Sequence, residues 1–220
     1  MLHIPVSVDI AVFRIQDKEL QVLLVKRDQK TSAYPGQWGL AGGILDANDA
    51  DLLQAVHRTL RRRLGSDLTY VEQVGTQGSA TRDPRGWSMT TLYFALVGFN
   101  DTVVTNDSMR WVSINDPQVR ALAFDHSQLL TMAVQRLQNK TVYSLLPAYL
   151  LPDDFTYTEL HAIYEIILGR SSDESKFRTK LKGHPDLILG MKRTGVSHRQ
   201  PVMLRVSPVP SKLLFPKPLF

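Results

Sequence analysis

Hydrophobic and polar residues follow different periods along the chain, and the changes of period predict its strands and helices. Residues 6–13 and 20–25 are rich in β-branched and aromatic side chains, and the turn-like segment 16–18 separates them. This pattern predicts two neighbouring strands. Residues 91–97 and 110–114 have the same character and predict two more. Helical patterns lie between and after these strands, so the first 140 residues are predicted to form an α/β domain.

Two amphipathic helices are predicted within this domain. Apolar residues at positions 53, 56, 60 and 64 predict the first, with Asn48 or Asp49 as its N-cap and Gly65 as its C-cap. Pro35 and Gly36 break the chain ahead of this helix, and residues 38–43 are predicted to be a glycine-rich loop. Residues 127–139 predict the second helix, with Leu129, Leu130, Ala133, Val134 and Leu137 on one side.

The C-terminal part has a different organisation. Prolines at 147 and 152 indicate a linker over residues 141–153. A capping box from Thr156 to Glu159 then predicts a helix that ends at Gly169. A second helix is predicted over 174–182, with Asp173 as its cap and with Phe177 and Leu181 buried.

Two short strands follow these helices, at 187–189 and 201–206, and a polar turn at 192–199 joins them. Two helices followed by a basic hairpin are typical of a winged helix-turn-helix domain, here over residues 154–206. The proline-rich tail, residues 207–220, fits either disorder or packing as an arm on a partner.

Composition limits the class of protein. A hydrophobic fraction of 43% and a charged fraction of 21% are those of a globular protein with an ample core. Apolar runs stay well short of the roughly 20 residues that span a bilayer, and the first 12 residues lack a secretory pattern. The absence of cysteine excludes disulfides, thiolate catalysis and cysteine-bound zinc. The sequence therefore predicts a cytoplasmic protein without a membrane partner.

The net charge of +5 is concentrated in the C-terminal part of the chain. Residues 1–140 hold 15 basic and 14 acidic residues, whereas residues 141–220 hold 11 basic and 7 acidic. Between positions 176 and 205 there are eight basic residues and one acidic residue, Asp186. This asymmetry favours a polyanionic partner. An ordinary solvated basic surface would give the same count.

The second helix of the winged domain supplies candidate DNA contacts. Once Phe177 and Leu181 are buried, its basic and hydroxyl side chains face outward, where they can reach base edges and phosphates. Basic residues in the predicted wing are candidates for phosphate or minor-groove contacts. Charge that serves only solubility is the alternative for both groups. The candidate DNA-binding residues are Lys176, Arg178, Thr179, Lys180, Lys192, Arg193, His198 and Arg199.

The segment from Gly43 to Gly65 resembles the signature of the Nudix hydrolases. Residues 38–45 resemble the loop that enters this signature, with Ala41 where proline is common, and residues 58–65 resemble its helical end. In these hydrolases, helix carboxylates hold divalent ions that polarise a pyrophosphate and activate water. The resemblance implies a Nudix-like fold around a phosphate-binding loop.

This chain departs from the hydrolases where the chemistry takes place. Thr59, Arg62 and Arg63 occupy the three helix positions that carry glutamates in the family. The spacing from Gly43 to Arg58 is one residue longer than the pattern, and arginines repel a dication. We therefore expect no catalytic residue, no metal site, no cofactor and no hydrolysis.

Further segments resemble the Nudix-related transcriptional regulators of the NrtR family. They are residues 82–96 and 122–126 in the first domain and residues 158–169 and 173–181 in the second, and the resemblance extends from 6 to 206. It implies an α/β Nudix-like mixed-sheet sandwich followed by a winged helix-turn-helix domain. It also implies a homodimer that binds a double-stranded operator, represses genes of NAD metabolism or of sugar use, and responds to ADP-ribose or a related nucleotide.

Phosphate chemistry and this resemblance select candidate ligand-binding residues. Guanidinium groups fit phosphate oxygens in pairs, and glycines let a diphosphate approach the backbone closely. Trp38 or Trp87 is a candidate to stack on adenine, with core packing as the alternative, and Arg62 and Arg63 are candidates to neutralise a diphosphate in place of a metal. The candidate ligand-binding residues are Arg27, Trp38, Gly42, Gly43, Arg82 and Arg85.

Two other functions remain open at this point. The first is a Nudix-type nucleotide pyrophosphatase with an accessory domain, which the missing carboxylates disfavour. The second is a DNA-binding protein whose Nudix-like domain only dimerises and senses nothing. Magnesium-dependent nucleotide turnover would identify the enzyme, and a thermal shift induced by a nucleotide would distinguish a sensor from a scaffold.

Overall fold

The computed structural model describes most of the chain, and contacts between its Cα atoms divide it into two compact units. The described residues are 4–68, 70–191, 202–207, 214 and 218–219. The first unit comprises Met1–Val97 and Asp101–Arg136, and the second comprises Gly98–Asn100 and Leu137–Phe220. The domain bounds expected from the sequence stay a prediction.

The first unit is built on a mixed sheet, as predicted. Its central strand is β1 (Val6–Gln16), which pairs in parallel with β6 (Ser88–Leu96) and antiparallel with β2 (Glu19–Lys26) and β4 (Ala41–Ile44). The β1–β2 hairpin turns at Asp17 and Lys18, which both have the positive φ that a tight two-residue hairpin turn requires. The described strands of this sheet are β1 (Val6–Gln16), β2 (Glu19–Lys26), β3 (Trp38–Gly39), β4 (Ala41–Ile44), β5 (Tyr70–Ser79), β6 (Ser88–Leu96) and β7 (Met109–Ser113).

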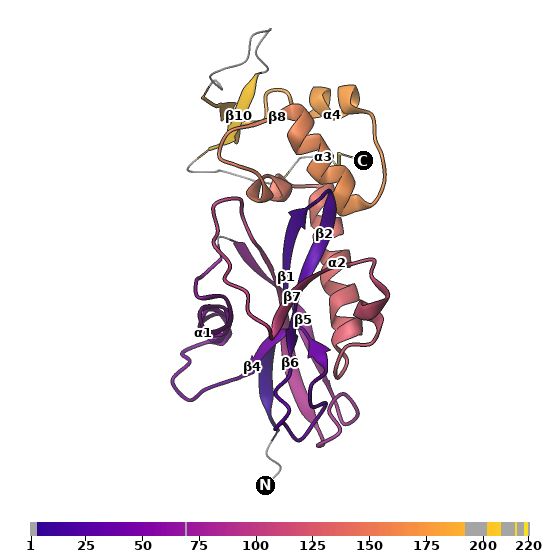
Figure 1. The fold of residues 1–220 in the computed structure, drawn as a ribbon. Helices are drawn as coiled ribbons and strands as arrows, with labels where there is room; N and C mark the ends of the chain where they lie inside the picture. The colour runs from indigo at the N-terminus through magenta and orange to yellow at the C-terminus, as the bar shows by residue number, and fades with distance from the viewer. Residues whose placement is uncertain (1–3, 69, 192–201, 208–213, 215–217, 220) are drawn as a thin grey trace. The chain divides into compact units, whose positions relative to one another are not determined.

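Two helices flank this sheet on opposite sides (Figure 1). They are α1 (Leu52–Leu64) and the first part of α2 (His126–Val142), and a short 3-10 helix, η1 (Pro117–Arg120), precedes α2. Val56 and Leu60 of α1 are buried against Val8 and Ile10 of β1. Because side chains alternate along a strand, every second residue of β1 faces α1, and the others face the opposite layer.

The start of α1 and the segment before it differ from the prediction. Asp51 is the N-cap in place of Asn48 or Asp49, since its carboxylate accepts the Gln54 N–H at 2.7 Å. Leu53 is 45% exposed and not on the buried face. The predicted C-cap, Gly65, is confirmed.

The predicted loop at 38–43 instead contains strands β3 and β4. Glycine favours loops, but here it lets the chain pair closely with β1, where Gly42 lies opposite Asp9. Strand β5 was not predicted, and its pairing with β6 shifts register between Gln73 and Gly75. A register shift interrupts the alternation that identifies a strand from sequence.

The second unit is a winged helix, as predicted. Its strands pair in the order β8 (Phe155–Thr156), β10 (Met203–Val206) and β9 (Leu187–Leu189), all antiparallel, beside the two helices. The capping box of Thr156 with Glu159, the C-cap Gly169 and the N-cap Asp173 are confirmed. The elements are η2 (Leu146–Leu150), β8 (Phe155–Thr156), α3 (Tyr157–Leu168), α4 (Glu174–Leu181), β9 (Leu187–Leu189) and β10 (Met203–Val206).

Residues from the expected linker and tail contribute to the core of this unit. Leu145 and Ala148 pack with the buried face of the winged helix, although proline in this segment had suggested a linker. Leu219 belongs to the same cluster, and its N–H donates to the Val142 carbonyl at 2.8 Å. The described end of the tail is therefore packed within its own unit. Among the described residues, no helix combines the length and the apolar character needed to cross a membrane.

Candidate functional site

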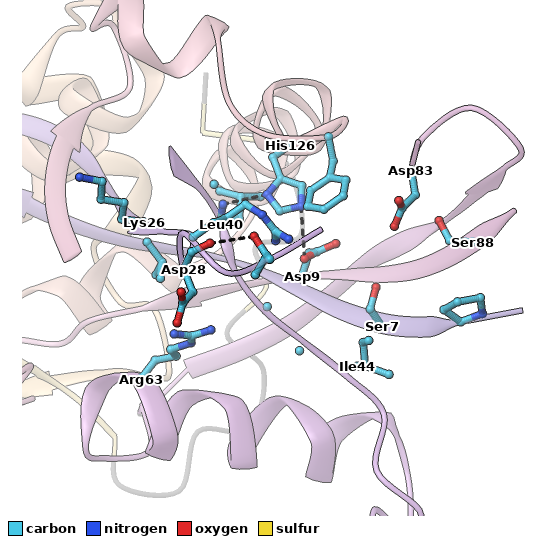
Figure 2. A pocket seen from close by; sticks show the side chains of 18 of the residues that line it. Ser7, Asp9, Lys26, Asp28, Leu40, Ile44, Arg63, Asp83, Ser88 and His126 are labelled. Carbon is cyan, nitrogen blue, oxygen red and sulfur yellow. Dashed lines mark hydrogen bonds and ion pairs between the residues drawn. The ribbon is translucent and has the colours of Figure 1, made fainter. Parts of the chain in front are cut away.

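A cation-rich cavity of about 720 Å³ lies in the first unit (Figure 2). Strands β1, β2 and β4, helix α1, the loop before β6 and the start of α2 all contribute to its walls. Six basic side chains line it against three carboxylates, so the cavity suits an anion. The basic residues are Lys26, Arg27, Arg62, Arg63, Arg82 and Arg85, and the acidic residues are Asp9, Asp28 and Asp83.

Arg82 is the centre of a buried ion-pair network. Its side chain is 8% exposed, and two of its nitrogens donate to the two carboxylate oxygens of Asp125 at 3.0 and 2.9 Å. A third nitrogen donates to Ser88 at 3.2 Å, and Asp9 lies 3.5 Å away. Two-point pairing of a guanidinium with a carboxylate fixes its orientation. Arg82 therefore joins the loop before β6 to the start of α2, and its donors are already engaged.

His126 completes the wall beside this network (Figure 2). Its Nδ1 accepts the Leu40 N–H at 2.9 Å, which places the proton of the neutral ring on Nε2, 3.5 Å from an Asp9 oxygen. Burial lowers the pKa of His126, and this outweighs the opposite effect of Asp9 and Asp125. The ring is therefore neutral at pH 7 and forms a fixed, hydrogen-bonded part of the cavity wall.

Two glycines allow the strands to approach this wall. A Cβ at Gly39 would lie 2.7 Å from the His126 Nδ1, and a Cβ at Gly42 would collide with the Asp9 carboxylate. Gly42 and Gly43, which the sequence predicts to bind the ligand, both line the cavity. Their close packing explains why this segment needs residues without side chains.

Phe124 organises two other arginines and was missed in the sequence. The guanidinium carbon of Arg27 lies 4.5 Å from the centre of the Phe124 ring, and that of Arg85 lies 5.9 Å away. Tyr34 packs edge-on against the same ring at 4.8 Å. Arg85 also forms a double hydrogen bond to Asp83, which raises the pKa of Arg85. Phe124 has a φ of 57°, a conformation that sequence patterns do not reveal for a non-glycine residue.

Helix α1 presents Arg62 and Arg63 to the cavity. Thr59, one turn before Arg63, is 3% exposed, and its hydroxyl has no hydrogen-bond partner among the residues that the structure describes. Within the same residues, the buried Nε of Arg63 also lacks a partner. Burial, and next the charge of Arg62, lower the pKa of Arg63.

These α1 side chains do not fit the divalent cation that the Nudix fold implies. A hydroxyl and two guanidiniums occupy the positions that would need carboxylates, and guanidiniums repel a dication. The nearby acid, Asp49, is engaged by Arg58 through two hydrogen bonds of 2.7 and 2.6 Å. Within the described ranges, no group of three His, Cys, Asp or Glu side chains could hold a metal ion.

The predicted adenine-stacking tryptophans lie away from this wall. Trp38 is outside the set of residues that line the cavity. The Arg110 guanidinium lies 3.9 Å from the centre of its ring, and the Lys26 Nζ lies 5.9 Å from it. Trp87 packs over Gly78 and is partly exposed. Ligand stacking on either ring stays a prediction.

The predicted DNA-binding residues of α4 lie on its exposed side. Lys176, Arg178 and Thr179 are exposed, while Phe177 and Leu181 are buried. The Arg178 guanidinium lies 5.1 Å from the centre of the Tyr157 ring and stays exposed. Lys180 is also exposed, but its Nζ donates to the Leu219 carbonyl. The wing candidates Lys192, Arg193, His198 and Arg199 lie outside the described residues.

Two family models match this chain, one in each part. Residues 4–132 match the NUDIX domain, and residues 147–205 match the NrtR DNA-binding winged helix domain. A relative from Acinetobacter baylyi, described as an ADPR responsive transcriptional repressor NtrR, is 43% identical over 181 residues. That match covers 80% of this chain and 71% of the relative.

Solved structures give the same relationship. Shewanella oneidensis NrtR complexed with a 27mer DNA superposes with a TM-score of 0.86 at 34% identity, over 98% of this chain and 99% of that one. The NUDIX domain of the same protein, complexed with ADP ribose, matches with a TM-score of 0.55 at 35% identity, over 62% of this chain and 90% of that one. These matches and the two domain models place this chain in the NrtR family of Nudix-related transcriptional regulators.

Proposed function

We propose that this protein is a transcriptional repressor that binds ADP-ribose without hydrolysing it and controls genes of NAD metabolism. The observation that supports this most directly is that α1 presents Arg62 and Arg63 to the cavity. Nudix hydrolases hold metal ions on carboxylates at these helix positions. Arg62 and Arg63 can attract a diphosphate but cannot bind magnesium or generate a metal-bound hydroxide. A winged helix with exposed cations on α4 supplies the DNA-binding half.

The cavity supports a nucleotide diphosphate as the effector. ADP-ribose carries two phosphates between two sugars, and the cation excess of the cavity matches that charge. Arg27 is held over Phe124 and has its pKa lowered, first by burial and then by the charge of Arg85. A bound phosphate would relieve this repulsion. The described complex of the Shewanella NUDIX domain with ADP ribose supports the same ligand class.

The winged helix supports an operator in double-stranded DNA. Helix α4 has one apolar side that packs on α3 and one side with Lys176, Arg178 and Thr179, as expected of a helix that enters the major groove. A homodimer would present two such helices about 34 Å apart, one turn of DNA, to two half-sites. Such a protein acts in the cytoplasm, where bacterial DNA is found.

Binding of ADP-ribose and binding of operator DNA are coupled if the two prefer different conformations of the protein. We expect ADP-ribose to weaken operator binding by about 1–3 kcal/mol. Reciprocity then requires operator DNA to weaken ADP-ribose binding by the same factor.

Calorimetric titration of ADP-ribose into free and DNA-saturated protein measures this coupling. We expect a weaker affinity in the presence of operator. Equal affinities in the two titrations would exclude ADP-ribose as the effector, and would leave a DNA-binding protein with a scaffold that senses nothing.

Incubation of the protein with ADP-ribose and magnesium or manganese tests the absence of hydrolysis. The ligand should stay intact over hours. Release of AMP at an ordinary enzymatic rate, about 1 per second or faster, would instead identify a pyrophosphatase.

A further inference from the structure

The arginines of the cavity differ in whether an anion within the protein already neutralises them. Arg82 is paired with Asp125 and approached by Asp9, and Arg85 is paired with Asp83. Arg63 has neither a carboxylate partner nor an acceptor for its buried Nε in the described part of the chain. A partly buried guanidinium without a counter-ion is unfavourable, so such a group is retained where a ligand supplies the missing anion.

The surroundings of Arg63 are suited to a phosphate. Arg63 projects from α1 into the cavity (Figure 2). After burial, the charge of Arg62 lowers the pKa of Arg63, and the charge of Arg63 is one of the causes that lower the pKa of Arg27. Thr59 lies one helical turn away on the same face and holds a second unpartnered polar atom, its hydroxyl. A Cβ at Gly43 would lie 3.0 Å from that hydroxyl, so the glycine leaves the space between α1 and β4 open.

We infer that Arg63 is a metal-independent phosphate-binding residue, which takes the electrostatic role that a divalent cation has in the Nudix hydrolases. The inference rests on the proposed function in that the ligand contains a diphosphate. The guanidinium donates hydrogen bonds to phosphate oxygens and neutralises part of their charge, and no bond of the ligand is broken. Arg82 and Arg85, by contrast, are positioning residues that hold the loop before β6.

Helix α1 offers a matched control. Arg61 lies two residues before Arg63, is 62% exposed and pairs with Asp67 at 2.7 Å, outside the set of residues that line the cavity. Arg61→Gln and Arg63→Gln remove the same charge from the same turn of the same helix. A difference in ligand affinity between the two variants therefore depends on where the removed charge lies and not on the net charge of the protein.

The experiment is calorimetric titration of ADP-ribose, adenosine and inorganic pyrophosphate into the parent chain and both variants, with EDTA or with magnesium. We expect Arg63→Gln to weaken ADP-ribose and pyrophosphate roughly 10- to 150-fold, as for one charge-assisted hydrogen bond. Adenosine binding should not change, and Arg61→Gln should bind all three like the parent. The parent should bind ADP-ribose equally well in EDTA and in magnesium.

A thermal shift measurement separates this role from a structural one. Without ligand, Arg63→Gln should melt at the parent's temperature or above it, because it removes a partly buried charge whose Nε has no partner among the described residues. With saturating ADP-ribose, the parent should gain more stability than the variant. A variant that melts clearly below the parent without ligand would identify Arg63 as a structural residue and overturn the inference.

Other outcomes also decide the matter. If Arg63→Gln binds ADP-ribose like the parent, or if the parent requires magnesium to bind it, the inference is wrong while repression relieved by ADP-ribose can still hold. If ADP-ribose has no effect on operator binding by the parent, the proposed function fails instead. The pyrophosphate titration still decides the role of Arg63 in that case: loss of binding only in Arg63→Gln supports it, and no pyrophosphate binding by the parent overturns it.

Discussion

The cavity of the first unit and helix α4 of the second both present cations, in opposite surroundings. Arg82 is buried between Asp9 and Asp125, and Arg27 and Arg85 lie over Phe124. On α4 the side chains of Lys176 and Arg178 are exposed to solvent. Arg82, which is buried and paired, has a fixed position and shapes a cavity for one small ligand, whereas exposed cations can adjust to the phosphates along a polymer.

The largest expected effect comes from the buried network of the cavity. Arg82→Gln leaves Asp9 and Asp125 without their guanidinium, so the first unit should lose about 3–5 kcal/mol of unfolding free energy. Urea unfolding followed by tryptophan fluorescence measures this, because Trp38, Trp87 and Trp111 all belong to the first unit.

Arg120→Gln is the control for this variant, since Arg120 is an exposed residue of the same unit and its loss should stay within about 0.5 kcal/mol. If Arg82→Gln were as stable as the parent but no longer bound ADP-ribose, Arg82 would be a ligand contact, and the contrast between paired and available arginines would be wrong.

The second prediction concerns the tail in the winged helix. Leu219 is 5% exposed within the core cluster, so Leu219→Ala should destabilise the second unit by about 2–4 kcal/mol. Hydrogen exchange of the α3 and α4 amides reports this unit specifically. Leu214→Ala is the matched control, because Leu214 is about half exposed. Equal exchange in the two variants would show that the tail does not stabilise α4.

The third prediction compares two cations of α4. Arg178→Ala should weaken operator binding by about 1–3 kcal/mol if its guanidinium reads a base pair. Lys180→Ala should have a smaller effect, because its ammonium already donates to the Leu219 carbonyl. Binding of operator and of unrelated DNA at one salt concentration measures both. A larger loss from Lys180→Ala would reverse the order of the two residues.

The smallest expected effect is a pH dependence from His126. Burial lowers its pKa below the usual 6.5, so between these two values the unfolded chain binds more protons than the folded one. Stability contributed by neutral His126 is complete above pH 6.5 and decreases as the pH falls, by up to about 1.4 kcal/mol per pH unit.

The variant His126→Gln keeps an acceptor for the Leu40 N–H but does not titrate. Its urea midpoint, followed by tryptophan fluorescence, should therefore depend less on pH between 7 and 5 than that of the parent. An unchanged slope would show that carboxylates account for the acid sensitivity of the first unit.

The winged helix could be predicted from sequence because its signals are local. The capping box of Thr156 with Glu159 spans one turn of α3, and Asp173, Phe177 and Leu181 lie within about two turns of α4. Their spacing also selects the exposed side of α4. Only the tertiary structure showed that Leu219, far along the chain, fills this core and engages Lys180.

The sequence predicted the chemistry of the cavity but not which of its arginines are paired. The sequence by itself determined that arginines replace the metal-binding carboxylates at positions 62 and 63 and that glycines precede α1. Which arginines are neutralised depends on partners such as Asp125 for Arg82, 43 residues apart, and on the backbone conformation of Phe124. Such contacts follow from the packing of the sheet and not from local periodicity, so only the tertiary structure decided that the Arg63 Nε has no partner among the described residues while Arg82 and Arg85 are paired.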